Sequence, residues 1–109
     1  MARHEFGMMQ HVPQRGVRYD DYEPQKYHCI SVEDEDLEVF DRAFCQLDCY
    51  WHTTDVPGKG LAWCGITLIP PQALSAFIGI INGAAGLREL SSLAEKACEE
   101  KKWIIHYGL

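Results

Sequence analysis

The sequence predicts an α+β fold, a two-layer sandwich in which a four-stranded antiparallel sheet carries helices on one face. Two observations predict it. Some segments are short and β-branched or alternate between apolar and polar residues, as strands do, whereas others repeat apolar residues at helical spacing. These segments follow one another in the order β-α-β-β-α(α)-β, and a length of 109 residues corresponds to a single domain.

The first strand and the first helix are predicted between residues 27 and 44. Residues 27–32, YHCISV, are aromatic and β-branched, which is typical of a strand. Ser31 and the acidic residues after it suit a helix start, because side-chain oxygens and negative charge complement the free N–H groups of a first turn. Apolar residues at helical spacing then predict a short helix. They are Leu37, Phe40, Ala43 and Phe44.

Residues 44–54 and 61–69 are predicted to form a hairpin around the turn-forming sequence DVPGKG. The first segment alternates, with apolar residues or cysteines at its odd-numbered positions, and the second is mostly apolar. A register that places Trp51 opposite Cys64 gathers the apolar side chains of both strands on one face. Burial should enforce that register, because a slip of one residue would mix the faces.

The C-terminal part is predicted to contain two helical segments and a final strand. Pro70-Pro71 ends the hairpin and opens a helix, since proline suits the first helical turn, and Asn82-Gly83 breaks this helix. Apolar residues from Leu87 to Cys98 recur at helical spacing and predict the second segment. Residues 103–109, WIIHYGL, predict the last strand.

This order of elements fits a ferredoxin-like split βαβ arrangement whose second helical region is broken in two. It predicts the strand order 4-1-3-2, with right-handed crossovers. Residues 1–26 show no clear period and are predicted to be an extended or partly disordered N-terminal arm. Residues 27–109 are then the single α+β domain. Such a topology does not by itself define a function.

The negative charge of the chain lies in the predicted domain. Ten basic and sixteen acidic residues give a net charge of −6, and residues 1–26 are neutral with four of each. An acidic chain without a basic stripe argues against nucleic-acid binding. The densest acidic stretch is interpreted either as a solvated helix start or as a surface that attracts a basic protein partner. Its members are Glu33, Asp34, Glu35, Asp36, Glu38 and Asp41.

The apolar segments and the cysteines of the sequence favour a cytoplasmic protein. No apolar run is long enough to predict a membrane span, and the N-terminus lacks the apolar core of a secretory signal. The five cysteines are odd in number and lack a framework spacing, which favours reduced thiols. No sequence fingerprint predicts a cofactor.

One set of residues contains ligands that zinc prefers. The set is Cys45, Cys49, His52 and Cys64, and its spacing is not that of a common finger or ribbon. The predicted strand points Cys45 and Cys49 toward the core and His52 away from it. Packing of free cysteines as small apolar side chains is therefore the competing interpretation.

The outer face of the sheet carries the main candidate for an interface or ligand patch. Its members are Tyr50, His52, Trp63, Gly65 and Thr67. Aromatic residues on a face without helices indicate that something covers it, either a second subunit or the N-terminal arm. A small acid–base site is the alternative, with His52 transferring a proton and Asp48 orienting its ring.

The leading hypothesis is a non-enzymatic acidic protein that forms a homo-oligomer or binds a protein partner through this face. An inhibitor of the immunity type, which masks a basic enzyme, fits the size and the charge. Two alternatives stay open. One is a small enzyme or small-molecule-binding protein that uses the patch, and the other is a structural zinc protein.

Overall fold

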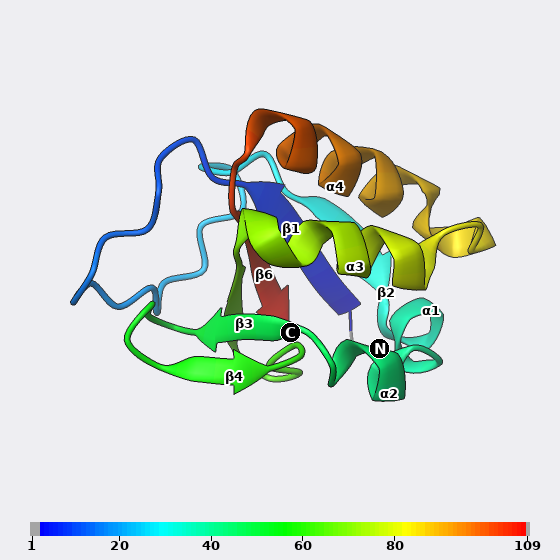
Figure 1. The fold of residues 1–109 in the computed structure, drawn as a ribbon, viewed down its shortest axis with the longest axis horizontal. Coiled ribbons are helices and arrows are strands. Elements are labelled where there is room, and N and C mark those ends of the chain that lie inside the picture. The colour runs from blue at the N-terminus through cyan, green and yellow to red at the C-terminus, as the bar shows by residue number, and fades with distance from the viewer. Residues whose placement is uncertain (1–2, 109) are drawn as a thin grey trace.

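The computed structural model describes residues 3–108 and confirms the α+β class, with one antiparallel sheet of six strands (Figure 1). The strands are β1 (Arg3–Met8), β2 (Ile30–Glu33), β3 (Asp48–Trp51), β4 (Pro57–Lys59), β5 (Ile66–Ile69) and β6 (Ile104–Gly108). The helices are α1 (Asp34–Glu38), α2 (Asp41–Phe44), α3 (Pro71–Ile81) and α4 (Arg88–Glu100), and a 3-10 turn, η1 (Ala85–Leu87), precedes α4.

The structure corrects both the number and the order of the predicted strands. The order is β2-β1-β6-β5-β3-β4, with six strands instead of four, so the predicted order 4-1-3-2 is wrong. β6 lies between β1 and β5, although the prediction placed residues 103–109 at an edge. Residues Ile104 to Tyr107 are all buried, as a strand covered on both faces requires.

The predicted N-terminal arm supplies one of the two additional strands. β1 lies inside the sheet, where it pairs with β2 on one side and with β6 on the other. Phe6 of β1 is fully buried in the core. Residues 9–29 return along the helix-free face of the sheet before β2 begins. Described residues of β1 and of segment 9–29 therefore pack with the sheet that residues 30–108 form.

The register of the predicted hairpin is wrong by three residues. Trp51 pairs with Thr67, not with Cys64, and Tyr50 pairs with Leu68. An odd shift exchanges the faces on which side chains lie. The shift arises because the predicted turn contains β4, which pairs with β3 as an edge strand. Gly60, with a φ of 78°, then turns the chain into a loop that delays β5 until residue 66.

The predicted helices are present, with two corrections. α3 begins at Pro71 and is followed by Asn82, as predicted. The first predicted helix is split into α1 and α2, which are separated at Val39 and Phe40. Ser31 lies in β2 and does not cap α1; Glu33 occupies the N-cap position instead. Among the described residues, no helix has the length and apolar character needed to cross a membrane.

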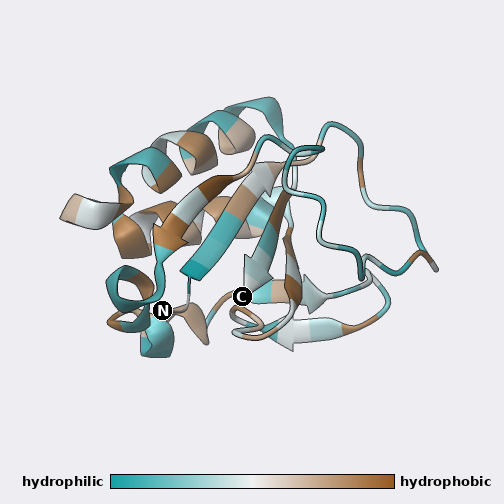
Figure 2. Cartoon of the chain, turned by 180° about the vertical axis from the view of Figure 1, so that it is seen from behind, coloured by the Kyte–Doolittle hydropathy of each residue, from teal (hydrophilic) through white to brown (hydrophobic). Residues whose placement is uncertain are grey.

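The two faces of the sheet belong to two separate apolar clusters. α3 and α4 cover one face, where Phe6, Ile69 and Ile104 pack against helix side chains such as Phe77 (Figure 1). The other face carries no helix (Figure 2). There, Tyr27 and Met9 from the irregular segment 9–29 pack with Ile66, Leu68, Ile105 and Tyr107 of β5 and β6.

Candidate functional site

The predicted patch is not a single surface, because its members lie on different sides of the sheet. Thr67 is buried and faces the helices, where it contacts His106. Trp63 packs on the same side against His4 and donates its indole N–H to Asp41. Tyr50 belongs to the opposite cluster and packs on Trp103, with ring centroids 5.7 Å apart.

His52 has a carboxylate partner, but this partner is Asp20 and not the predicted Asp48. The Nδ1 of His52 lies 2.8 Å from Oδ1 of Asp20. Hydrogen bonding from Arg18 first, and then the His52 ring, holds the pKa of Asp20 below its ordinary value. The backbone N–H of Ile66 points at Nε2 of His52 from 3.4 Å. Both ring nitrogens are therefore engaged, and the side chain fastens segment 9–29 to β3 and β5.

Gly65, another member of the predicted patch, makes room for the ring of His52. A Cβ atom at residue 65 would lie 2.9 Å from Nε2 of His52. Asp48, by contrast, is exposed on β3 and pairs with Lys59 across the strand pair β3–β4. The structure therefore brings His52 and Gly65 together and separates both from Asp48.

The four candidate zinc ligands do not form a metal site. Within residues 3–108, no group of three or more histidines, cysteines or acidic residues is arranged to hold a metal ion. Cys45 and Cys64 are exposed, whereas Cys49 is buried in the core. Burial raises the pKa of the Cys49 thiol to about 12, so this side chain packs as a neutral group.

Asp48 and Tyr50 line a shallow groove between β3 and the start of α3. Its volume is about 400 Å³, and Trp103 closes it from one side. The side chains of Gln46 and Gln72 add amide groups to its wall. Asp48 and Tyr50 also line a second concave surface on the strand pair β3–β4, together with Cys49 and Lys59.

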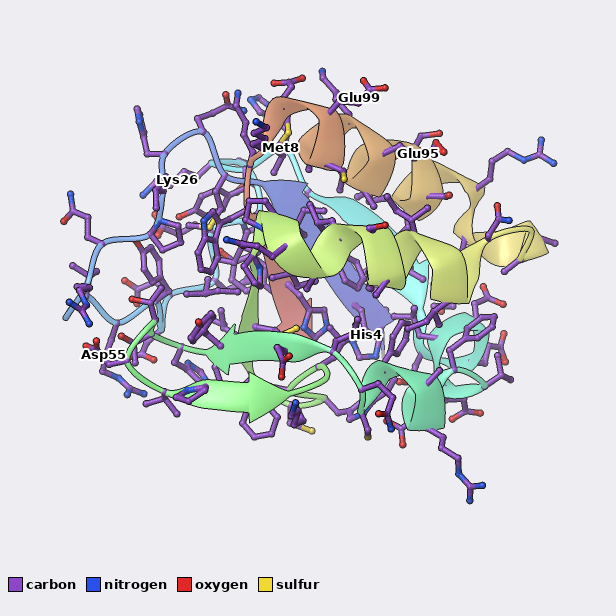
Figure 3. All side chains as sticks on the ribbon, in the orientation of Figure 1. His4, Met8, Lys26, Asp55, Glu95 and Glu99 are labelled. Carbon is purple, nitrogen blue, oxygen red and sulfur yellow. The ribbon has the colours of Figure 1, made fainter. Side chains whose placement is uncertain are left out.

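A network that the sequence interpretation missed lies under the helices, at the centre of the sheet. Nδ1 of His4 lies 2.8 Å from Nε2 of His106, on the neighbouring strands β1 and β6. Nε2 of His4 lies 2.8 Å from Oδ1 of Asp34, at the start of α1. Nδ1 of His106 lies 3.1 Å from the hydroxyl of Thr67 on β5. We refer to His4, which is labelled in Figure 3, and His106 as the histidine pair; both side chains are buried.

The partners of this network assign the protons along it. The backbone N–H of Ala62 donates to the Thr67 hydroxyl, which then donates to Nδ1 of His106. Nε2 of His106 donates to Nδ1 of His4, and Nε2 of His4 donates to Asp34. In this arrangement both rings are neutral and every polar hydrogen has an acceptor. Burial, and then the neighbouring His4 ring, keep the pKa of His106 well below its ordinary value.

The network is not an accessible catalytic site. Thr67 and His106 are both 0% exposed, so no substrate can reach the hydroxyl from the surface. The sequence contains one sign of this network. His4 and Phe6 are two positions apart, as are Ile104 and His106, so each pair would share one face of a strand. This sign could be used only after β1 had been recognised as a strand.

The acidic stretch forms an exposed surface at one end of the sheet, on α1 and α2 (Figure 1). Glu33, Glu35, Glu38 and Asp41 are all exposed, and none forms an ion pair with a described residue. Val39 lies among them in the sequence and is 73% exposed. We call these five residues the acidic face.

Comparisons of the chain with protein-family models, with curated proteins and with solved structures find no match.

Proposed function

We propose that this chain is a non-enzymatic binding protein whose acidic face docks on a basic surface of a protein partner, in the manner of a small inhibitor. The observation that carries the proposal is the set of exposed carboxylates on α1 and α2 that lack ion-pair partners among the described residues. The only basic residue in this stretch is Arg42. Unpaired charge of one sign speeds association with a surface of the opposite sign and disfavours other partners.

Two features favour a different protein over a second copy of this chain. Segment 9–29 packs on the helix-free face, so this face is less available for self-association than the sequence predicted. Two acidic faces would repel each other, because like charges placed opposite one another cost free energy. The exposed Val39, at the end of α1, supplies an apolar contact beside the charged residues, and interfaces combine apolar contacts with a polar rim.

Site-specific photo-crosslinking in the cells that produce the protein tests this proposal. In one variant a photoreactive residue replaces Val39. In a second variant, the matched control, it replaces Val12, which is also exposed but lies in segment 9–29. We expect a crosslinked partner from position 39 only, with basic residues at the crosslinked site. The double change Glu35→Lys with Glu38→Lys should abolish the crosslink.

The double change Glu95→Lys with Glu99→Lys is the control for net charge. Both residues are exposed on α4 and point away from the sheet (Figure 3). This variant alters the total charge by the same amount but leaves the acidic face intact, so it should keep the crosslink. The proposal is contradicted if both double variants lose the crosslink equally, or if position 39 of the unchanged protein gives no crosslink.

Ligand binding in the groove between β3 and α3 is a second candidate, supported by the aromatic pair Tyr50 and Trp103 beside the carboxylate of Asp48. Aromatic faces next to a carboxylate favour a cationic ligand. Tryptamine is a suitable probe, and its binding should shift the Trp103 indole signal in an NMR titration. The variant Tyr50→Ala should lose this shift, and an unchanged wild-type spectrum eliminates the candidate.

A further inference from the structure

We propose that the histidine pair is an acid-sensitive switch that holds β1 and α1 against the centre of the sheet and releases them when both rings carry a proton. The switch joins three elements that are distant in sequence. His4 belongs to β1, His106 to β6, and Asp34 begins α1. The two rings stack with centroids 5.0 Å apart, so any rearrangement of one ring displaces the other.

The number of protons on the two rings decides whether the hydrogen bond between them can form. Only one hydrogen fits between Nδ1 of His4 and Nε2 of His106, which are 2.8 Å apart. The neutral pair supplies this hydrogen from His106. A first added proton places a cation on His4, against Asp34, and the hydrogen between the rings then comes from His4.

A second proton leaves the pair without an acceptor. Both rings then direct an N–H group into the same 2.8 Å gap, and two positive charges lie side by side in the core. The rings are 1% and 0% exposed, so water cannot solvate these charges while the structure stays closed. Separation of β1 from β6 is the direct way to relieve the repulsion.

The surroundings of the pair offer one compensating anion. Asp34 contacts His4 and is half-buried. Trp63 packs edge-on against His4, with ring centroids 4.8 Å apart, and connects it to Asp41 only through the indole. Among residues 3–108 no carboxylate contacts His106, which packs against Phe6 and Thr67.

The remaining elements around the pair present no charge to it. α3 contains no titratable residue, and its buried side chains are apolar. α4 buries Leu90, Ala94 and Ala97, whereas its charged residues are exposed. On β2, Val32 is the buried residue. Glu5 and Tyr107 alternate with the two histidines along β1 and β6, so their side chains lie on the opposite face of the sheet.

Hydrogen exchange measured by mass spectrometry on the full chain tests the switch. Protection is compared at about pH 7.5 and about pH 5, after correction for the intrinsic exchange rates, because histidines change charge in this range. We expect β1, β2 and α1 to lose protection by at least about tenfold at the lower pH. α3 and β5 should change less.

The variant His106→Gln separates the switch from general acid instability. Its amide can donate to Nδ1 of His4 but cannot take up a proton. We expect its opening to require a pH lower by about one unit or more, whereas the exposed control His28→Gln should behave as the wild type. Asp34→Asn removes the compensating anion and should move the opening to higher pH.

An NMR titration of the wild-type imidazole nitrogens gives a second test that needs no variant to fold. The signals of His4 and His106 should titrate together, at the pH at which β1 loses protection. Unchanged protection of β1 at about pH 5, independent titration of the two rings, or opening of His106→Gln at the wild-type pH overturns the proposal.

Discussion

On one face of the sheet, Phe6 packs against Phe77 of the regular helix α3, whereas on the other face Tyr107 packs in a cluster with Tyr27 of segment 9–29, which has no regular structure. The helix-covered side combines apolar packing with one closed polar network. The other side depends on aromatic side chains and on single hydrogen bonds, such as that from the backbone N–H of Glu23 to the Tyr107 hydroxyl. One sheet thus carries a face that resists local opening and a face that permits it.

The close approach of segment 9–29 to β1 shows how the second face is sealed. A Cβ atom at residue 7 would lie 2.6 Å from Cβ of Tyr27 and 2.7 Å from its carbonyl oxygen. Glycine at this position lets the irregular segment lie directly on the strand. The packing of segment 9–29 on the sheet therefore depends on a backbone contact. The periodicity of side chains in the sequence does not predict such a contact.

Removing a large side chain from the helix-covered face should have the largest effect. Phe77 is fully buried and contacts both Phe6 and Phe44. We expect Phe77→Ala to lower the free energy of unfolding by about 3–5 kcal/mol, because it leaves a cavity among rigid elements. Urea unfolding followed by circular dichroism measures the change. A loss below about 1 kcal/mol would mean that this face is not tightly packed.

The matching change on the helix-free face should cost less and act more locally. Tyr27→Ala should lower the free energy of unfolding by about 2 kcal/mol, the amount expected for exposing one buried aromatic side chain. Hydrogen exchange should rise mainly in residues 9–29. Equal loss of protection in α3 and α4 would contradict the separation of the two faces.

The pH dependence of stability should distinguish the faces through His106. Its pKa in the folded state lies well below 6.5, whereas the unfolded chain has the ordinary value. Below pH 6.5 the unfolded state therefore binds more protons, and stability falls as the pH falls. The loss approaches about 1.4 kcal/mol per pH unit for this one group. His106→Gln should remove this contribution to the pH dependence of stability. An identical pH dependence in the wild type and in the variant would show that His106 is not its source.

Disrupting the contact between Asp20 and His52 should have the smallest effect. The side chain of Asp20 is half exposed, so Asp20→Asn should leave the global free energy of unfolding within experimental error. The amide of Tyr19, which donates to the carbonyl of His52, should nevertheless exchange faster with solvent. A global destabilisation would show that this contact supports more than the irregular segment.

The sequence predicted the elements whose side chains follow a period. Pro71 and the apolar positions after it placed α3, and the acidic surface of α1 and α2 followed from composition. β1 was missed because its six residues include three polar side chains that are buried or paired in the sheet. β4 was missed because proline and glycine are usually turn residues, and both also occur in short edge strands.

The members of the predicted patch are dispersed for a related reason. The position of the patch depended on the hairpin register, and a shift of three residues moved Thr67 into the core beside His106. The partner of His52 came from Asp20, thirty-two positions away along the chain, which no local pattern could reveal. The histidine pair is separated by 102 positions. Contacts of that range depend on the strand order, and the strand order was the least determined part of the prediction.

NMR coupling across the hydrogen bond between His4 and His106 shows whether β1 lies inside the sheet beside β6. In nitrogen-labelled protein at neutral pH, we predict a scalar coupling between Nδ1 of His4 and Nε2 of His106. We also predict a proton contact between Phe6 and His106, which face each other on β1 and β6. Absence of the coupling, together with a His4 ring whose N–H exchanges as fast as that of the exposed His28, would contradict this position of β1.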